Sequence, residues 1–447
     1  MEITVMGFVL IPIGIIMLFF NTEYLLLGVV FFSGFTGSSV ANFESISFSL
    51  QPSFYFGMLF IIKYVICILL RNKKLVIPNK FLMLFVCLSF ISLIMPILLE
   101  YRDVKVLSPD SIITNVKFRL QNVTQFLYLF FCFLLYWMTK DYIGSDYEKI
   151  LRLIKVFLYG GIIVCLLGLY QEIAYILGMP FDVWFRSGVH GNVQPYGNFV
   201  RVYSVTQEPS MLAMYLAPLL ALVFFINKKI FKYKLMLIAM LIITGILSTS
   251  TTFVVGICVF AILLIYDKVL KPYYNVQDVK VLKYFGISLF VFFITCSFAF
   301  MISPQIKYLL TTSILEKFSG TNVSGSERLT SFIHHLKVGL NYPLLGVGFG
   351  AARSKDLFTT LLANVGVFCT SLLIIYFISM RYRLNRVRDY KVRQFSQGFS
   401  YYLTIIFIVM FISVPELYFL YVWISMAIAE GLLKINQKKL AKQEVIL

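Results

Sequence analysis

Long apolar runs separated by short polar segments dominate the chain. A helix needs about 20 mostly apolar residues to cross the roughly 30 Å hydrocarbon core of a bilayer. Twelve runs approach this length: 3–20, 53–70, 80–99, 123–139, 150–177, 210–226, 235–249, 252–266, 285–303, 358–380, 400–414 and 417–433. The pattern therefore predicts an all-α polytopic membrane protein, a single integral membrane domain over residues 1–447, with about twelve transmembrane helices.

One further apolar segment is too short to count as a span. Tyr24 to Phe35 runs directly into the Gly/Ser-rich stretch from Ser33 to Ser39. We interpret this segment as a half-span or re-entrant piece, and a thirteenth crossing is the alternative.

The basic residues predict the orientation. In the twelve-span count their clusters all fall on one side, which the positive-inside rule assigns to the cytoplasm. The clusters are Arg71, Lys73 and Lys74; Lys140, Lys149 and Arg152; Lys228, Lys229, Lys232 and Lys234; Lys268, Lys271, Lys280 and Lys283; the six cations from Arg381 to Arg393; and Lys434, Lys438, Lys439 and Lys442. Both termini are thus expected in the cytoplasm, and 434–447 is expected to form a basic cytoplasmic tail.

The composition agrees with a membrane protein, and this changes the interpretation of its net positive charge. Of 447 residues 60% are apolar and 13% are charged, and 39 Lys and Arg against 21 acids give a net charge of +18. In a soluble protein this excess would indicate a nucleic-acid partner. Here most of it is explained by sidedness, so no nucleic-acid partner is expected. All seven cysteines lie in apolar runs without a C-x-x-C pair, which predicts neither disulfides nor a metal site.

Two long outer loops, 178–209 and 304–357, hold the chemically useful residues. Long loops are where a membrane scaffold tends to place function. All three histidines of the chain and four arginines lie in them: His190, His334, His335, Arg186, Arg201, Arg328 and Arg353. We expect these two loops to form the active site.

A helix is predicted within the second loop. Ser324 and Glu327 fit the S-x-x-E capping box that opens a helix. From residue 329 onward the helical period puts one set of side chains on an apolar stripe and another on a polar side. The stripe comprises Leu329, Phe332, Ile333, Leu336 and Leu340, and the polar side comprises Arg328, Ser331 and His335. Two interpretations remain open: an oxyanion site at the helix start, or a surface helix with a solvated polar face.

The first loop ends at the start of a span. Glu208-Pro209 heads the run 210–226, so Glu208 is expected at the membrane–water boundary, either as a helix cap or as a catalytic group. Arg201 stands seven residues earlier in an otherwise apolar setting, which favours a functional role. The glycines at 346, 348 and 350 follow no strand, so we expect a chain reversal rather than a nucleotide loop.

The arginines of these outer loops, above a large apolar bundle, favour a substrate with an anionic group and an apolar part. The loops contain no Cys/His ligand spacing and no D-x-D pair, so neither a metal nor another cofactor is predicted. A lipid-linked pyrophosphate has the required chemistry.

Three motifs, in order, resemble those of Wzy-type O-antigen and capsular polysaccharide polymerases, whose superfamily also includes the O-antigen ligases. The motifs are Arg201-x-x-Ser-x-x-x-Glu-Pro-Ser210, Leu247-Ser-Thr-Ser-Thr-Thr252, and Gly325-Ser-Glu-Arg328 followed by Tyr342-Pro-Leu-Leu-Gly-Val-Gly-Phe-Gly350. The resemblance covers nearly the whole chain.

The resemblance implies a metal-independent membrane glycosyltransferase of the GT-C class. Such an enzyme would join undecaprenyl-pyrophosphate-linked oligosaccharide repeats on the outer face of the bacterial cytoplasmic membrane. The family role of holding pyrophosphate carries over to Arg201 and Arg328, with Arg186 and Arg353 as further candidates. Besides membrane lipid and the lipid-linked substrate, a chain-length regulator and a flippase are candidate partners.

The sequence departs from the ligase branch at two places. Ligases carry an arginine where this chain has Thr251, and His-Asn where it has Lys355-Asp356. The general base is left open: Glu208 is the first candidate and His335 the second, and His334, His190 and Ser331 are further site candidates.

Three alternative functions are kept open. They are an O-antigen ligase, a flippase for the same lipid-linked oligosaccharide, and a structural partner in a polysaccharide assembly complex. A flippase is expected to carry charges along the middle of its spans, whereas Lys63 and Glu172 lie near span ends.

Overall fold

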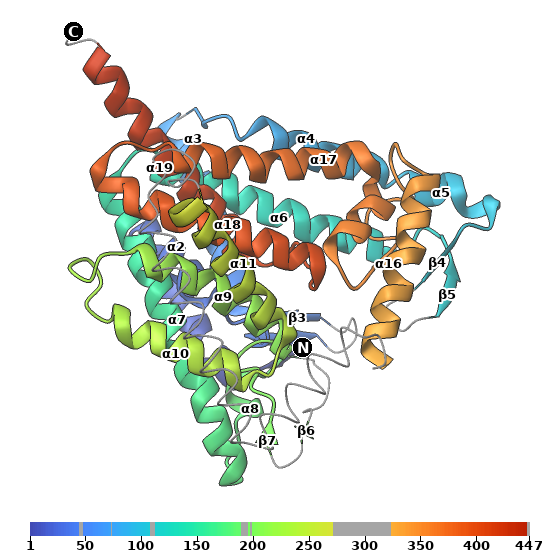
Figure 1. Ribbon diagram of the computed structural model, residues 1–447, viewed down its shortest axis with the longest axis horizontal. Coiled ribbons are helices and arrows are strands. Elements are labelled where there is room, and N and C mark those ends of the chain that lie inside the picture. The colour runs from blue at the N-terminus through green and yellow to red at the C-terminus, as the bar shows by residue number, and fades with distance from the viewer. Residues whose placement is uncertain are drawn as a thin grey trace.

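The computed structural model describes residues 1–43, 48–72, 74–107, 112–188, 195–196, 199–270 and 323–444. Helices make up most of this part of the chain (Figure 1). They are α1 (Val5–Phe19), α2 (Thr22–Phe32), α3 (Pro52–Arg71), α4 (Lys80–Ser92), α5 (Met95–Leu99), α6 (Leu120–Ile143), α7 (Tyr147–Ile176), α8 (Asp182–Phe185), α9 (Pro209–Phe225), α10 (Lys234–Leu247), α11 (Thr251–Ile265), α16 (Val323–Asn341), α17 (Leu357–Asn385), α18 (Tyr390–Ile412) and α19 (Leu420–Glu444). A 3-10 turn (Glu100–Arg102) follows α5 and a π turn (Tyr266–Leu270) follows α11.

The expected spans coincide with helices wherever the structure describes them. Seven helical segments in the described residues are long and apolar enough to cross a membrane: Pro52–Arg71, Lys80–Arg102, Leu120–Ile143, Tyr147–Ile176, Thr251–Lys268, Leu357–Asn385 and Tyr390–Ile412. Four further apolar helices, α1, α2, α9 and α10, are shorter. The expected span 285–303 lies outside the described residues. The described chain is thus mostly helical, which agrees with the prediction of an all-α polytopic membrane protein.

Short antiparallel strands pair the N-terminus with the segment before α3 and form hairpins in two of the loops. β1 (Glu2–Ile3) pairs with β2 (Ala41–Phe43), and β2 pairs with β3 (Phe48–Leu50) in the register Asn42↔Ser49. Two hairpins complete the set, β4 (Lys105–Leu107) with β5 (Ile113–Asn115) and β6 (Pro195–Tyr196) with β7 (Phe199–Val200). Because β3 leads directly into α3, the first residues of the chain lie where α3 begins. We call this end of the bundle the loop end.

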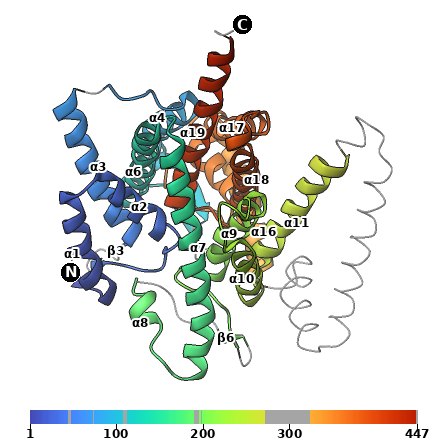
Figure 2. The same ribbon diagram turned by 90° about the vertical axis from the view of Figure 1, so that its left-hand side faces the viewer.

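The opposite end, where α3 stops at Arg71 and α7 starts at Tyr147, is the basic end. Lys140 there pairs with Glu430 at 2.6 Å, and Lys439 pairs with Asp389 at 2.9 Å. Helix α19, the last one, ends at the basic end, far from the N-terminus (Figures 1 and 2). The twelve-span count expected both termini on one side, and the structure places them at opposite ends.

The difference arises from the segment Tyr24–Phe35. α2 starts at the basic end, where Glu23 pairs with Arg152 at 2.5 Å, and it runs toward the loop end. Its 11 residues span only about 16 Å. Residues 33–40 continue without helical structure and are buried throughout. This segment is a short helix followed by irregular chain, and it adds one pass through the bundle.

The core lies around α9. A helix that is apolar on all sides is expected to be buried on all sides, and 14 of the 17 residues of α9 are buried. It packs against α18, α11, α10 and α7. In Figure 2, α1, α2 and α3 lie on one side of the upright α7, and α9, α10, α11 and α18 lie on the other.

A break in α17 receives the glycine-rich segment that follows α16. Gly366 has φ +77° inside α17, and Val367 N donates to Pro343 O at 2.8 Å across the break. Val347 N likewise donates to Ala363 O at 2.7 Å. A side chain at Gly346 (φ +61°) would overlap the Ala363 carbonyl. The glycines are therefore needed for close backbone contact, and the segment reverses the chain as the sequence predicts.

We expect Gly346→Ala to destabilise the fold far more than Gly178→Ala. Gly178 has φ +66°, and a methyl group added there would meet no atom within 4 Å, so its replacement costs only the left-handed strain of about 1–2 kcal/mol. Gly346 carries the same strain and a backbone overlap in addition. Thermal unfolding of the two purified variants in detergent measures the difference. Equal losses would contradict the described contact between the segment and α17.

Candidate functional site

The two loop arginines of the resemblance are linked through a serine- and threonine-rich turn at the loop end, which Arg201 contacts directly and Arg328 through Ser413. This turn, residues 248–252, joins α10 to α11. Arg201 Nε donates to Thr249 Oγ1 at 3.0 Å. The Thr252 and Ser413 hydroxyls lie 2.5 Å apart, and Arg328 donates to Ser413 O at 3.3 Å. The three motifs therefore come together in space, with Ser413 as the joint between the second and third.

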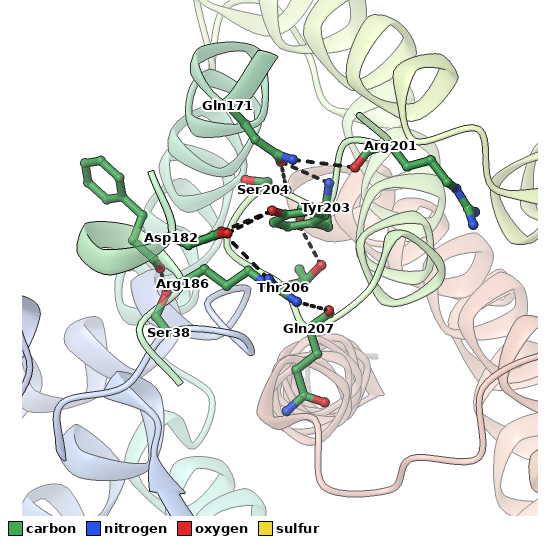
Figure 3. A network of polar contacts seen from close by, with 10 residues as sticks. Ser38, Gln171, Asp182, Arg186, Arg201, Tyr203, Ser204, Thr206 and Gln207 are labelled. Carbon is green, nitrogen blue, oxygen red and sulfur yellow. Dashed lines mark hydrogen bonds and ion pairs between the residues drawn. The ribbon is translucent and has the colours of Figure 1, made fainter. Parts of the chain in front are cut away.

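Gln171 of α7 holds the backbone that carries Arg201. Its Oε1 accepts hydrogen bonds from Tyr203 N at 3.1 Å and Ser204 N at 2.7 Å, and its Nε2 donates to Arg201 O at 3.5 Å (Figure 3). Ser204 has φ +52°, so this backbone departs from regular structure inside the bundle. Sequence reasoning missed Gln171, although a buried polar residue within an apolar span is a signal for such a role.

Glu208 lies near the arginines and is exposed. Its backbone caps α9, but its side chain makes no cap hydrogen bond, and its carboxylate instead accepts from Ser210 Oγ at 3.2 Å. The carboxylate is within electrostatic range of both guanidinium groups: it opposes the lowering of the Arg328 pKa by desolvation and adds to the rise in the pKa of Arg353, which Glu416 mainly causes. The prediction of Glu208 as a side-chain cap of the helix is therefore wrong, and its catalytic role stays a prediction.

Arg328 presents its guanidinium at the surface of this site. The residue is exposed, and partial desolvation lowers its pKa while the carboxylates of Glu208 and Asp356 oppose that shift. Arg328 thus combines a single long hydrogen bond with nearby acidic groups and accessible donor atoms.

Arg186 is placed differently from Arg201 and Arg328. Its side chain is buried, stacks 4.2 Å over the Tyr203 ring and donates to Gln207 O at 3.0 Å. Asp182 lies 3.7 Å away and accepts a hydrogen bond from the Tyr203 hydroxyl (Figure 3). These contacts tie α8 to the 203–207 segment, which is a structural role rather than the predicted pyrophosphate contact.

Arg353 is held by a carboxylate that sequence reasoning did not select. Glu416, in the turn between α18 and α19, forms an ion pair with Arg353 and is nearly buried, with a side-chain exposure of 6%. Burial raises the pKa of Glu416, and Arg353 and the Tyr418 hydroxyl oppose this rise. The sequence did contain a signal for Glu416, because this acidic residue directly precedes the expected span 417–433.

The helix predicted in the second loop is present as α16, and two residues of its polar side, Ser331 and His335, face the protein interior. Leu329, Ile333 and Leu340 of the apolar stripe are 60%, 43% and 61% exposed, whereas Ser331 and His335 are buried. The interpretation as a helix with a solvated polar face is therefore wrong for Ser331 and His335, while Arg328 at the start of that face is exposed. An outward apolar stripe suits a helix that contacts lipid. The chain before Val323, which was to complete an oxyanion site, lies outside the described residues.

His335 belongs to a buried polar chain. Its Nδ1 lies 2.7 Å from Ser331 O; the Ser331 hydroxyl lies 3.2 Å from Ser354 Oγ, which donates to Asp356 at 2.8 Å. Burial lowers the pKa of His335. With 0% exposure, His335 does not reach the surface where Arg201, Arg328 and Glu208 gather. His334 is partly exposed and contacts Lys105 O at 3.3 Å, and His190 lies outside the described residues.

No protein-family model matches the chain, and no curated protein matches it. Within the described ranges, no three His, Cys, Asp or Glu side chains are grouped closely enough to hold a metal ion.

The different settings of two arginines give a stability test. We expect Arg186→Lys to lower the free energy of unfolding by about 2 kcal/mol, because lysine loses the stacked plane and the hydrogen bond to Gln207 O. Arg328→Lys should change it by no more than about 0.5 kcal/mol, as is usual for exposed positions. Thermal unfolding of both variants in detergent is the measurement. A comparable loss in Arg328→Lys would show that Arg328 is also structural.

Proposed function

We propose that the protein is a polysaccharide polymerase that joins undecaprenyl-pyrophosphate-linked oligosaccharide repeat units on the outer face of the bacterial cytoplasmic membrane. The observation that carries this proposal is the link between Arg201 and Arg328. Arg201 bonds to Thr249 of the 248–252 turn, and Arg328 bonds to Ser413, which contacts Thr252 of the same turn. The exposed Glu208 carboxylate acts electrostatically on Arg328. This arrangement supports the binding of a pyrophosphate at the end of a large apolar bundle, and the order of the three motifs supports the polymerase branch.

In the proposed reaction the acceptor sugar hydroxyl attacks the anomeric carbon of the donor. A glycosidic C–O bond forms, the C–O bond to pyrophosphate breaks, and undecaprenyl pyrophosphate leaves. Arg201 and Arg328 stabilise the charge that develops on the leaving pyrophosphate, through donors already in place before the reaction. Glu208 accepts the hydroxyl proton, since it is the exposed carboxylate beside the arginines.

The membrane orientation follows from the same proposal. The basic end, with the cation clusters, faces the cytoplasm, and the loop end faces outward. The C-terminus is then cytoplasmic, while the N-terminus is outside because α2 adds a pass. If 285–303 is a span, the chain makes thirteen passes. Membership of the GT-C class is part of this proposal.

The Arg328→Ala variant tests the proposed function. Purified protein is given undecaprenyl-pyrophosphate-linked repeat units, and product length is read on a gel. Loss of one charge-stabilising donor group is expected to reduce elongation by roughly 10²–10³-fold. Lys337→Ala, an exposed cation on the same helix α16, serves as the matched control and should elongate like the unmodified chain.

An unchanged product distribution in Arg328→Ala would remove Arg328 from the mechanism. The same assay separates the alternatives: transfer to a different acceptor in a single step indicates a ligase, and translocation across liposomes without longer chains indicates a flippase. If none of these activities occurs, the role as a structural partner of an assembly complex is the one left.

A further inference from the structure

Two adjoining cavities lie beside the proposed pyrophosphate site and share part of their walls. The larger has a volume of about 270 Å³ and the smaller about 60 Å³. Residues from α6 and from the 413–418 turn line both of them, and the shared residues are Gln125, Tyr128, Arg353, Glu416 and Tyr418. The larger volume is close to the lower end of the range of about 300–1,000 Å³ that small-molecule sites have.

The charges in these walls cancel. Arg353 and Glu416 are the charged residues that line either cavity, and they form an ion pair with each other. A guanidinium bound to a carboxylate has little charge left for a second anion. The predicted role of Arg353 in pyrophosphate binding is therefore not favoured, and the walls suit a ligand without net charge.

The remaining polar groups fit sugar hydroxyls. Gln121, Gln125 and Gln207 line the cavities, and within the described chain their side-chain amides have no hydrogen-bond partner. Arg186 donates to the backbone carbonyl of Gln207, and Figure 3 shows the Gln207 side chain directed away from Arg186. An amide carries two donors and an acceptor, and a hydroxyl is both donor and acceptor, so each can satisfy the other. Tyr128 and Tyr418 add aromatic surface, as in many ligand sites.

We propose that these cavities bind neutral sugar units of the acceptor chain, with Gln125 and the Arg353–Glu416 pair as the hydrogen-bonding groups. The proposal rests on the proposed polymerase function and divides its substrates between two places. The pyrophosphate lies at Arg201 and Arg328, and uncharged sugars lie beyond Glu208. Glu208 directly follows Gln207, which lines the larger cavity, so it stands at the edge of the cavity on the chain that comes from Arg201.

Two separate probes test this division. One is the free repeat-unit oligosaccharide, released by mild acid from the lipid-linked pool of the producing cells and freed of phosphate. The other is inorganic pyrophosphate. Each is titrated calorimetrically into the purified full-length protein in detergent. Gln125→Ala is expected to weaken saccharide binding at least about tenfold and to leave pyrophosphate binding unchanged, and Arg328→Ala should do the reverse.

Gln397→Ala is the matched control. Gln397 is a half-buried glutamine of α18 two turns from the basic end, so its replacement should alter the binding of neither probe. Glu416→Gln is a second test of the cavity and should also weaken the saccharide alone. Thermal unfolding of Gln125→Ala and Glu416→Gln confirms that each variant is folded.

The outcomes separate this inference from the proposed function. Saccharide binding that Gln125→Ala and Glu416→Gln leave intact overturns the cavity assignment, even where elongation is normal. Absence of saccharide binding to the unmodified protein overturns it as well. Saccharide binding that depends on Gln125, in a protein that elongates no chains, keeps the sugar site and rejects the polymerase.

Discussion

The structure depends on one constraint: backbone polar groups at membrane depth must find partners inside the protein, because lipid offers none. Several buried segments of this chain are not helical. Residues 33–40, the 201–208 segment and the break in α17 all leave backbone groups without helical hydrogen bonds. They are satisfied by one another and by buried amides. Gly37 N donates to Val205 O at 2.7 Å, and Asn364 bonds both the N–H and the carbonyl of Ala352.

The same constraint positions the proposed site. Irregular backbone is tolerated only where other segments of the protein supply its hydrogen-bond partners. In this chain such segments pack against one another at the loop end. Gln171 holds the backbone of Arg201, and the contact between the glycine segment and α17 holds the chain that leads to Arg353. The arginines thus project from backbone that is fixed by hydrogen bonds rather than from free loops, which suits charge stabilisation by preorganised donors.

Four arginines that look alike in the sequence differ in what they contact. Arg186 is buried against Tyr203, and Arg353 is neutralised by Glu416, while Arg201 and Arg328 each contact the neighbourhood of the 248–252 turn. Their residue type and loop were predictable because Arg is rare in apolar surroundings. Their roles were not, since Tyr203 and Gln207 follow Arg186 by 17 and 21 residues and Glu416 is 63 residues from Arg353 along the chain.

Sequence alone determined the helical membrane fold, the positions of the described spans, the helix at α16 and the glycine chain reversal, because hydropathy, capping residues and glycine act over a few neighbouring positions. Tertiary structure decided the rest. Ser331 and His335 of α16 face inward because the protein interior, not lipid, supplies their hydrogen-bond partners. The segment from α2 to residue 40 can pass through the bundle because buried neighbours bond its backbone groups. Which arginine stays accessible likewise depends on partners distant in sequence, and no local pattern records them.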